Sequence, residues 1–273
     1  MTRSLLPRAA AAALVAAVAA PAAAPSGAGR PLVSLSATPA HLTLLGRAPQ
    51  TLVVHNDGAA AVQVAAGAAS FSFDAYGNAA IAPSPDPARS ARAWLIVRPR
   101  RLVLAPGAAG KLRISARPPR RASTGDHHAL VLLSTLVPGQ ARVAVRTRLG
   151  VLVLVRVPGR IVRRVAIRRI WVLRTRRGRS IVVSTVNRGN VAERLLPGRA
   201  TIALRRAGRL VATVLALPRD LLPHAPGLLL APVKRSLGGR FTAVVRVAGE
   251  PGWTAGPSIP PRAPAKKTTR LTL

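Results

Sequence analysis

Short apolar runs dominate this chain, and most of them alternate with polar positions and end at Gly, Pro or Asn. Side chains that alternate with a period of two lie on opposite faces of an extended strand. The clearest case is ARVAVRTRLGVLVLVRV at residues 141–157, where Val and Leu occupy one face and Arg occupies most of the other. No window of helical period competes with this pattern, so the sequence predicts an all-β fold.

The same pattern of two apolar runs separated by Asn-x-Gly occurs twice along the chain. TLVVHNDGAAAVQV at residues 51–64 and SIVVSTVNRGNVAERLL at residues 180–196 each have a β-branched run, then Asn-x-Gly, then a second apolar run. Asn, Asp and Gly tolerate positive φ and favour tight turns. We therefore expect an early hairpin in each of two related immunoglobulin-like β-sandwiches, and a later hairpin turned at Ala207-Gly208.

This repeat divides the chain into four predicted parts. They are a signal peptide at residues 1–28, a first sandwich at 30–158, a second sandwich at 159–249, and a flexible Pro- and Lys-rich tail at 250–273.

The N-terminus has the order of features expected of a secretory signal. Arg3 and Arg8 precede an apolar stretch at residues 9–20, and small residues follow. Cleavage after Ala24 or after Ala28 fits the small-residue rule, the latter better because Pro25 follows the former. A disordered Ala/Pro tail and an uncleaved anchor are the alternatives. No later run is long and apolar enough for a membrane span, so we expect a secreted protein associated with the cell envelope.

Three segments together resemble the N-terminal domain of PapD-like pilus chaperones. They are residues 51–64, 90–119 and 124–137, and the shared pattern falls on Asn56, Gly58, Pro99, Leu104, Pro106, Gly107 and Gly125. The resemblance covers residues 31–157 well and 160–249 loosely, and is closer to relatives among secreted Gram-positive and actinobacterial wall-associated proteins. It implies two tandem PapD-like sandwiches.

The resemblance also implies a mode of binding. In pilus chaperones the last strand of the first domain pairs with a client subunit, and basic residues in the cleft between the domains hold the client's C-terminal carboxylate. Residues 141–157 match that strand, whereas the sequence does not single out the cleft residues. The residues expected to carry strand pairing are Val143, Val145, Leu149, Val151, Val153 and Val155.

A formal net charge of +35, from 42 basic and 7 acidic residues, points to anionic partners. The densest basic cluster lies in residues 160–179 and contains no acid. Its candidate anion-binding residues are Arg160, Arg163, Arg164, Arg168, Arg169, Arg174, Arg176 and Arg177. Wall polymer or a lipid surface suits this cluster better than nucleic acid, because the chain carries a secretion signal and is only 3% aromatic. A solvated basic surface that reflects a GC-rich genome is the alternative.

No catalytic, metal or cofactor signature is present. The chain has no Cys, no G-x-S-x-G elbow, no Walker A loop and no H-E-x-x-H motif. The sequence Asp126-His127-His128 is the nearest to a ligand cluster, but adjacent residues of a strand face opposite sides. We therefore expect a non-enzymatic binding or assembly protein that pairs with an envelope protein through an edge strand. The alternative is a cationic structural protein that binds wall polymer or lipid by charge.

Overall fold

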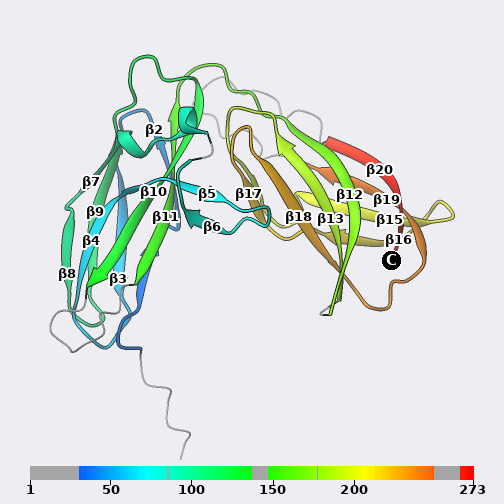
Figure 1. The fold of residues 1–273 in the computed structure, drawn as a ribbon, viewed down its shortest axis with the longest axis horizontal. Coiled ribbons are helices and arrows are strands. Elements are labelled where there is room, and N and C mark those ends of the chain that lie inside the picture. Colours follow the sequence, from blue (N-terminus) through cyan, green and yellow to red (C-terminus); the bar gives the residue numbers. More distant parts are fainter. Residues whose placement is uncertain (1–30, 85, 137–146, 177, 249–264) are drawn as a thin grey trace, which may run out of the picture. The chain divides into compact units, whose positions relative to one another are not determined.

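The computed structural model describes residues 31–84, 86–136, 147–176, 178–248 and 265–273. The chain is all-β and forms two immunoglobulin-like sandwiches, which Figure 1 shows as two groups of strands. The predicted fold class is confirmed. Val143 and Val145, the signal segment and Arg177 lie outside the described residues.

The first sandwich consists of two facing sheets. Sheet A has the strand order β1-β3-β9-β7, sheet B has the order β2-β11-β10-β4-β8, and β5 and β6 form a separate hairpin. The elements are β1 (Leu35–Thr38), β2 (His41–Leu45), β3 (Gln50–Asn56), β4 (Val62–Ala69), β5 (Phe71–Phe73), β6 (Ala79–Ile81), the 3-10 helices η1 (Pro87–Arg89) and η2 (Arg92–Trp94), β7 (Leu95–Arg98), β8 (Arg101–Leu104), β9 (Ala109–Ala116), β10 (Gly125–Leu136) and β11 (Arg148–Val157).

The second sandwich repeats this plan with a sheet β12-β13-β18, a sheet β16-β15-β19-β20 and a short pair β14-β17. Its strands are β12 (Val165–Thr175), β13 (Gly178–Asn187), β14 (Glu193–Leu195), β15 (Ala200–Arg206), β16 (Arg209–Leu215), β17 (Arg219–Leu221), β18 (Pro226–Val233), β19 (Arg240–Val247) and β20 (Ala265–Thr272). The hairpin predicted at Ala207-Gly208 is confirmed, because β15 pairs with β16 and both turn residues have positive φ.

Each sandwich encloses its own aliphatic core, as the low aromatic content requires. Alternate residues of the strands point inward, so Leu112 and Ile114 of β9 are fully buried while Arg113 between them is exposed. Ile181 and Ile202 occupy comparable places in the second core. Burial of such side chains contributes roughly 1.5–3 kcal/mol each and is the main stabilising term in both sandwiches.

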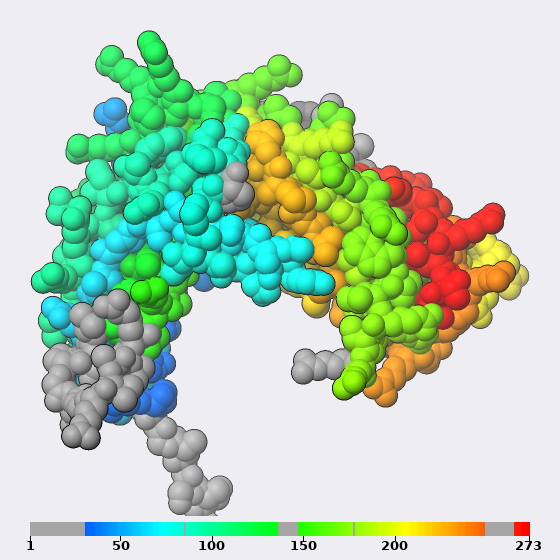
Figure 2. Space-filling model, in the orientation of Figure 1, coloured from blue at the N-terminus to red at the C-terminus, as the bar shows by residue number. Residues whose placement is uncertain are grey.

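The prediction of a flexible tail is wrong for its last residues. β20 pairs with β19 along its whole length, from Ala265 opposite Val247 to Thr272 opposite Arg240. Leu271 and Leu273 enter the second core. Figure 2 shows this C-terminal strand, in red, at the surface of the sandwich. The Lys and Thr residues of this segment conceal its strand pattern in the sequence. It forms a strand because β19 supplies a backbone partner, which composition does not reveal.

The predicted hairpin at the first Asn-x-Gly is also wrong. β3 and β4 lie in different sheets, and the Asn56 side chain joins those sheets. It is fully buried, and its Nδ2 donates to the carbonyl oxygens of Ala60, Leu104 and Ala105 at 2.8–3.1 Å. Its Oδ1 accepts from Gly58 N at 3.1 Å. Asn is therefore required here for hydrogen bonding across the sandwich rather than for a turn.

The second Asn-x-Gly repeats these contacts. Nδ2 of the buried Asn187 donates to Val191 O at 2.7 Å and to Leu221 O at 3.1 Å, and its Oδ1 accepts from Gly189 N at 2.8 Å. A Cβ at Gly189 would collide with Val162 O. A Cβ at Gly58 would likewise collide with the backbone of residues 32–34, which precede β1. The repeated motif is a bridge between sheets that needs a buried amide and a closely approached glycine.

We expect Asn56→Ala or Asn187→Ala to lower the free energy of unfolding by about 3 kcal/mol, because each leaves buried carbonyl groups without a donor. Chemical denaturation followed by circular dichroism measures this loss. Asn78→Ala is the control: Asn78 is exposed and donates only to the neighbouring Asp74, so a loss below about 1 kcal/mol is expected there. Equal losses at all three sites would contradict the bridging role.

Candidate functional site

The strand expected to meet a partner, β11, is covered unevenly. Along one side it pairs with β10, from Gly125 opposite Val157 to Ser134 opposite Arg148. Along the other side it pairs in parallel with β2, but only over residues 152–156. No described strand pairs with residues 148–151 on that side, and we call this stretch the free edge of β11.

The backbone groups at the free edge point outward. Thr135 N donates to Thr147 O at 3.0 Å, so the odd-numbered residues of β11 hydrogen-bond with β10. The N–H and C=O groups of Arg148 and Gly150 therefore point to the other side. Unpaired groups of this kind can accept an added strand.

The N-terminal strands explain why the edge is only half covered. β1 pairs with β3 in sheet A, whereas β2 pairs with β11 in sheet B. The chain changes sheets between Thr38 and His41, through Pro39, which lacks an N–H for a ladder. β2 consequently reaches β11 only at Leu152.

The side chains predicted to carry pairing are not available to a partner. Val151, Val153 and Val155 are at most 2% exposed and lie in the first core, and Leu149 packs against that core. The sequence pattern identified their shared face correctly but not its direction: the apolar face points into the sandwich. Only the backbone of the free edge can bind a strand.

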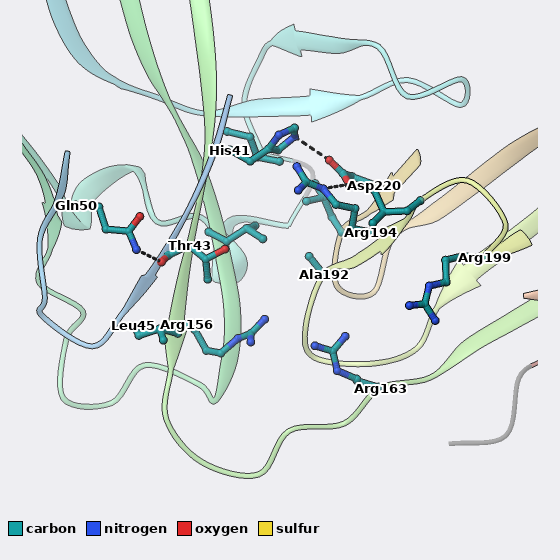
Figure 3. Close-up of a pocket in the computed structure, with 14 residues that line it drawn as sticks. His41, Thr43, Leu45, Gln50, Arg156, Arg163, Ala192, Arg194, Arg199 and Asp220 are labelled. Atoms are coloured by element: carbon teal, nitrogen blue, oxygen red, sulfur yellow. Dashed lines mark hydrogen bonds and ion pairs between the residues drawn. The ribbon is translucent and has the colours of Figure 1, made fainter. Parts of the chain in front are cut away.

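The opposite face of β11 borders a pocket lined by residues of both sandwiches (Figure 3). Leu152 and Leu154 line it together with Leu45, Leu196 and Leu222, and its volume is about 460 Å³. Its polar side is formed by His41, Arg156, Arg163, Arg194, Arg199 and Asp220. The pocket therefore combines apolar walls with several cations, next to the paired half of β11.

Carboxylates neutralise three of the four arginines. Arg156 bonds Asp126, Arg163 Nη1 lies 3.0 Å from Glu193 Oε2, and Arg194 Nε lies 3.4 Å from Asp220 Oδ1. His41 Nε2 is 3.0 Å from the other oxygen of Asp220. Burial pushes the pKa of Asp220 upward, but the hydrogen bond and charge of His41 and the charge of Arg194 outweigh it and hold that pKa below its ordinary value.

Arg199 is different from its neighbours. In the part of the chain that the structure describes, its guanidinium forms no ion pair, and it is half-buried in the wall of the pocket. A guanidinium presents a planar fork of donors that matches a carboxylate. Among the pocket's arginines, Arg199 is the best placed to bind an anion from outside. No sequence motif distinguishes it from the many other arginines.

Asp126, which the sequence placed in a polar turn, joins the two sandwiches. It is fully buried, and accepts from Arg156 Nε at 2.7 Å, Arg156 Nη2 at 2.9 Å and Ala192 N at 2.8 Å. Its own N–H donates to Asn190 O at 2.7 Å. The preceding Gly125 has φ +104, and a Cβ there would collide with Asn190 O. This carboxylate fixes the end of β11 against the second sandwich.

The two adjacent histidines face opposite sides of β10, as predicted. The His127 ring lies 4.4 Å from the Trp94 ring, and the His128 ring lies 5.3 Å from that of Phe71. Ser84 Oγ is 3.4 Å from His128 Nε2. Burial is the main cause that lowers both pKa values, that of His128 to about 4. In the described residues no group of three or more His, Cys, Asp or Glu side chains could hold a metal ion.

The predicted anion-binding cluster does not form a single site. Arg160, Arg164, Arg168, Arg169, Arg174 and Arg176 are exposed on β12 and the segments flanking it. Arg163 instead belongs to the pocket, where Glu193 neutralises it. Arg169 lies over the Trp171 ring at 5.8 Å. The exposed members form a basic strip along an edge strand.

Comparison with known proteins finds similarity to this chain only among solved structures. No protein-family model and no curated protein matches the chain. The Escherichia coli chaperone DraB is 14% identical, with a TM-score of 0.45, over 88% of this chain and 99% of its own. A chain from the Salmonella enterica SafA pilin in complex with the SafB chaperone is 14% identical, with a TM-score of 0.46, over 87% and 97%.

The chaperone CupB2 of Pseudomonas aeruginosa is likewise 14% identical, with a TM-score of 0.44, over 87% of this chain and 100% of its own. At these identities and TM-scores the likeness says nothing about what this chain binds. Nothing in these structures supports the closer match to Gram-positive and actinobacterial wall-associated proteins. Within the described residues, no helix is long and apolar enough to cross a membrane.

We expect acid to destabilise the protein through His128. Its pKa is about 4 in the folded state and near 6.5 when unfolded, so the unfolded state binds more protons between these values. Stability is therefore full above pH 6.5, and about 3 kcal/mol is lost as the pH falls to 4. Asp86, Arg89 and His127 are the charged or titratable groups around the ring.

The measurement is the free energy of unfolding at several pH values for the wild type, His128→Gln and the control His55→Gln, whose side chain is only partly buried on sheet A. Subtracting the His128→Gln curve from the wild-type curve isolates the contribution of this ring. A difference that stays flat between pH 6.5 and 4 would contradict the assignment.

Proposed function

We propose that this protein is a non-enzymatic, chaperone-like binding protein of the cell envelope that holds a client protein by strand addition at the free edge of β11. The observation that carries the proposal is the half-covered strand: β2 pairs with residues 152–156, and no described strand covers residues 148–151. An extended client segment would hydrogen-bond to Arg148 and Gly150, and its specificity would come from neighbouring surfaces.

The pocket gives this binding mode a second contact. A client strand that continues along sheet B from the free edge approaches a cavity with leucine walls and the guanidinium of Arg199, which forms no ion pair with a described residue. A C-terminal carboxylate that follows an apolar residue suits this combination, because the carboxylate satisfies the guanidinium while the side chain covers the leucines. Arg199 is therefore the proposed carboxylate anchor, a role that the sequence left unassigned.

The proposal includes location and chain organisation. Residues 1–28 would direct export and be removed, and the two sandwiches, near residues 30–158 and 159–249 with β20 added to the second, would act outside the cytoplasm. The chemistry is binding only: the proposal requires no cofactor and no catalytic group.

A second candidate function is charge-based binding of wall polymer or an anionic lipid surface. The observation in its favour is the exposed basic strip of β12 and its flanks, whose members at Arg164, Arg168, Arg174 and Arg176 form no ion pair with any described residue. Such binding should weaken sharply as salt screens the charges, whereas backbone pairing should not.

The test is a pull-down from cell-envelope extract with the mature protein, eluted first with high salt and then with denaturant. We expect a client that resists the salt step, and we expect Arg148→Pro to reduce its recovery about tenfold. Proline removes the outward N–H at the free edge and sets a ring in the path of the added strand, while the ladder to β10 is unchanged.

Val103→Pro is the matched control. Ala66 N donates to Arg100 O, so by alternation Val103 of β8 also points its N–H away from its neighbouring strand. Equal loss with both variants, or recovery of anionic polymer alone and entirely in the salt step, would overturn strand addition. Loss with Arg199→Gln but not with Val103→Pro would support the carboxylate anchor.

A further inference from the structure

The outward face of sheet A in the first sandwich carries a fixed row of cations that the client site does not use. Arg113 of β9 lies directly opposite Arg98 of β7 on one side and Thr51 of β3 on the other. Lys111 is two residues from Arg113 on the same strand and therefore faces the same side. All four side chains are exposed.

This arrangement is unfavourable by itself. Like charges directly opposite each other across two strands destabilise a sheet. No residue of β1, β3, β7 or β9 is acidic, and none of the four ion pairs of the described chain involves Arg98, Lys111 or Arg113. The strands thus hold three positive charges together, and no acidic group among the described residues pairs with them.

Two other cross-strand arginine pairs show how the chain relieves this repulsion elsewhere. In the pair Arg174 and Arg179, Arg179 Nη2 donates to Arg235 O at 2.9 Å. In the pair Arg206 and Arg209, Arg206 donates to Gly238 O and lies over the Phe241 ring. Within the described residues, none of the three cations on sheet A has a hydrogen-bond, ion-pair or ring partner of this kind.

The same three cations line one depression of about 390 Å³. Its other walls are Thr51, Gln50, Leu112 and the prolines Pro49 and Pro99. The depression thus combines two guanidinium forks, one ammonium group and a threonine hydroxyl on a rigid sheet. That donor set suits a compact, multiply charged oxyanion, which Arg binds through paired hydrogen bonds and Lys through its point charge.

We propose that this depression, lined by Arg98, Lys111 and Arg113, is a binding site for a phosphate group. The bound phosphate accepts hydrogen bonds from the two guanidinium groups and from Lys111, and it removes the repulsion between Arg98 and Arg113. None of the three cations lines the pocket at Arg199, with which the depression shares only Gln50, and none belongs to the free edge of β11. The phosphate site therefore does not depend on the proposed client binding.

The experiment is isothermal titration of the mature protein with inorganic phosphate and with tripolyphosphate, each at constant ionic strength set with chloride. We expect saturable binding of one phosphate group in the depression. Arg113→Gln and Arg98→Gln should each weaken it about tenfold, since each removes a charge-assisted hydrogen bond. Arg209→Gln is the matched control, because Arg209 is an equally exposed cross-strand arginine, opposite Arg206 on a different sheet and outside the basic strip of β12.

A second measurement protects the test from folding defects. Arg113→Gln should raise the melting temperature at low salt, because it relieves the repulsion, and phosphate should then stabilise the variant less than the wild type.

Vesicles of phosphatidylglycerol, compared with vesicles of phosphatidylcholine, distinguish a lipid headgroup from free phosphate as the source of the group. Selective, Arg113-dependent binding to either source supports the site.

Three results would overturn the proposal. Binding that does not saturate indicates general attraction by the net charge. Equal weakening by Arg209→Gln and Arg113→Gln indicates a delocalised effect. Unchanged affinity in both Arg113→Gln and Arg98→Gln places the phosphate elsewhere.

Discussion

The change of sheets between Thr38 and His41 is the constraint on which the proposed site depends. Because Pro39 interrupts the N-terminal strand, its first half completes sheet A and its second half covers only residues 152–156 of β11. The opposite end of β11 is fixed separately, where Asp126 accepts two hydrogen bonds from Arg156 and one from Ala192 of the second sandwich. A buried carboxylate is costly unless it is fully paired, and here its partners come from both sandwiches. β11 is thus held in place at the Arg156 end, and its other end carries the free edge.

The contacts around the pocket also join the first sandwich to the second. His41, the first residue of β2, bonds Asp220 of the second sandwich, and Asp220 also meets Arg194. His41 pairs with Leu152, where the covered part of β11 begins, so the start of this cover is bonded to the second sandwich in the wall of the pocket. Three of the pocket's arginines pair with carboxylates, and among the described residues Arg199 has no acidic partner. Arg199 is therefore the cation of the pocket that can bind an anion from outside. On sheet A, the register of β3, β9 and β7 instead brings several unpaired cations of the described chain together at the depression.

The sequence predicted what alternation and turn chemistry control. It indicated an all-β chain with two sandwiches, the turn at Ala207-Gly208 and the alternation of β9. It failed where tertiary partners decide. Asn56 and Asn187 looked like turn residues because a bridging amide has no local signature, and β20 looked like a tail because its partner β19 lies outside the local window. For β11 the sequence defined an apolar face but could not say that this face fills the core. Asp126 and Arg199 could not be selected among many similar residues without knowing what lies beside them.

The central claim is that the backbone of residues 148–151 is open and receives a client strand. Amide hydrogen exchange at Arg148 and Gly150 in the free and the client-loaded protein tests it most directly, with Leu149 and Val151, which bond β10, as internal references. We expect rapid exchange at Arg148 and Gly150 in the free protein and strong protection when the client is bound, while the two references are protected in both states. Protection of Arg148 and Gly150 in the free protein, or no change on client binding, would contradict it.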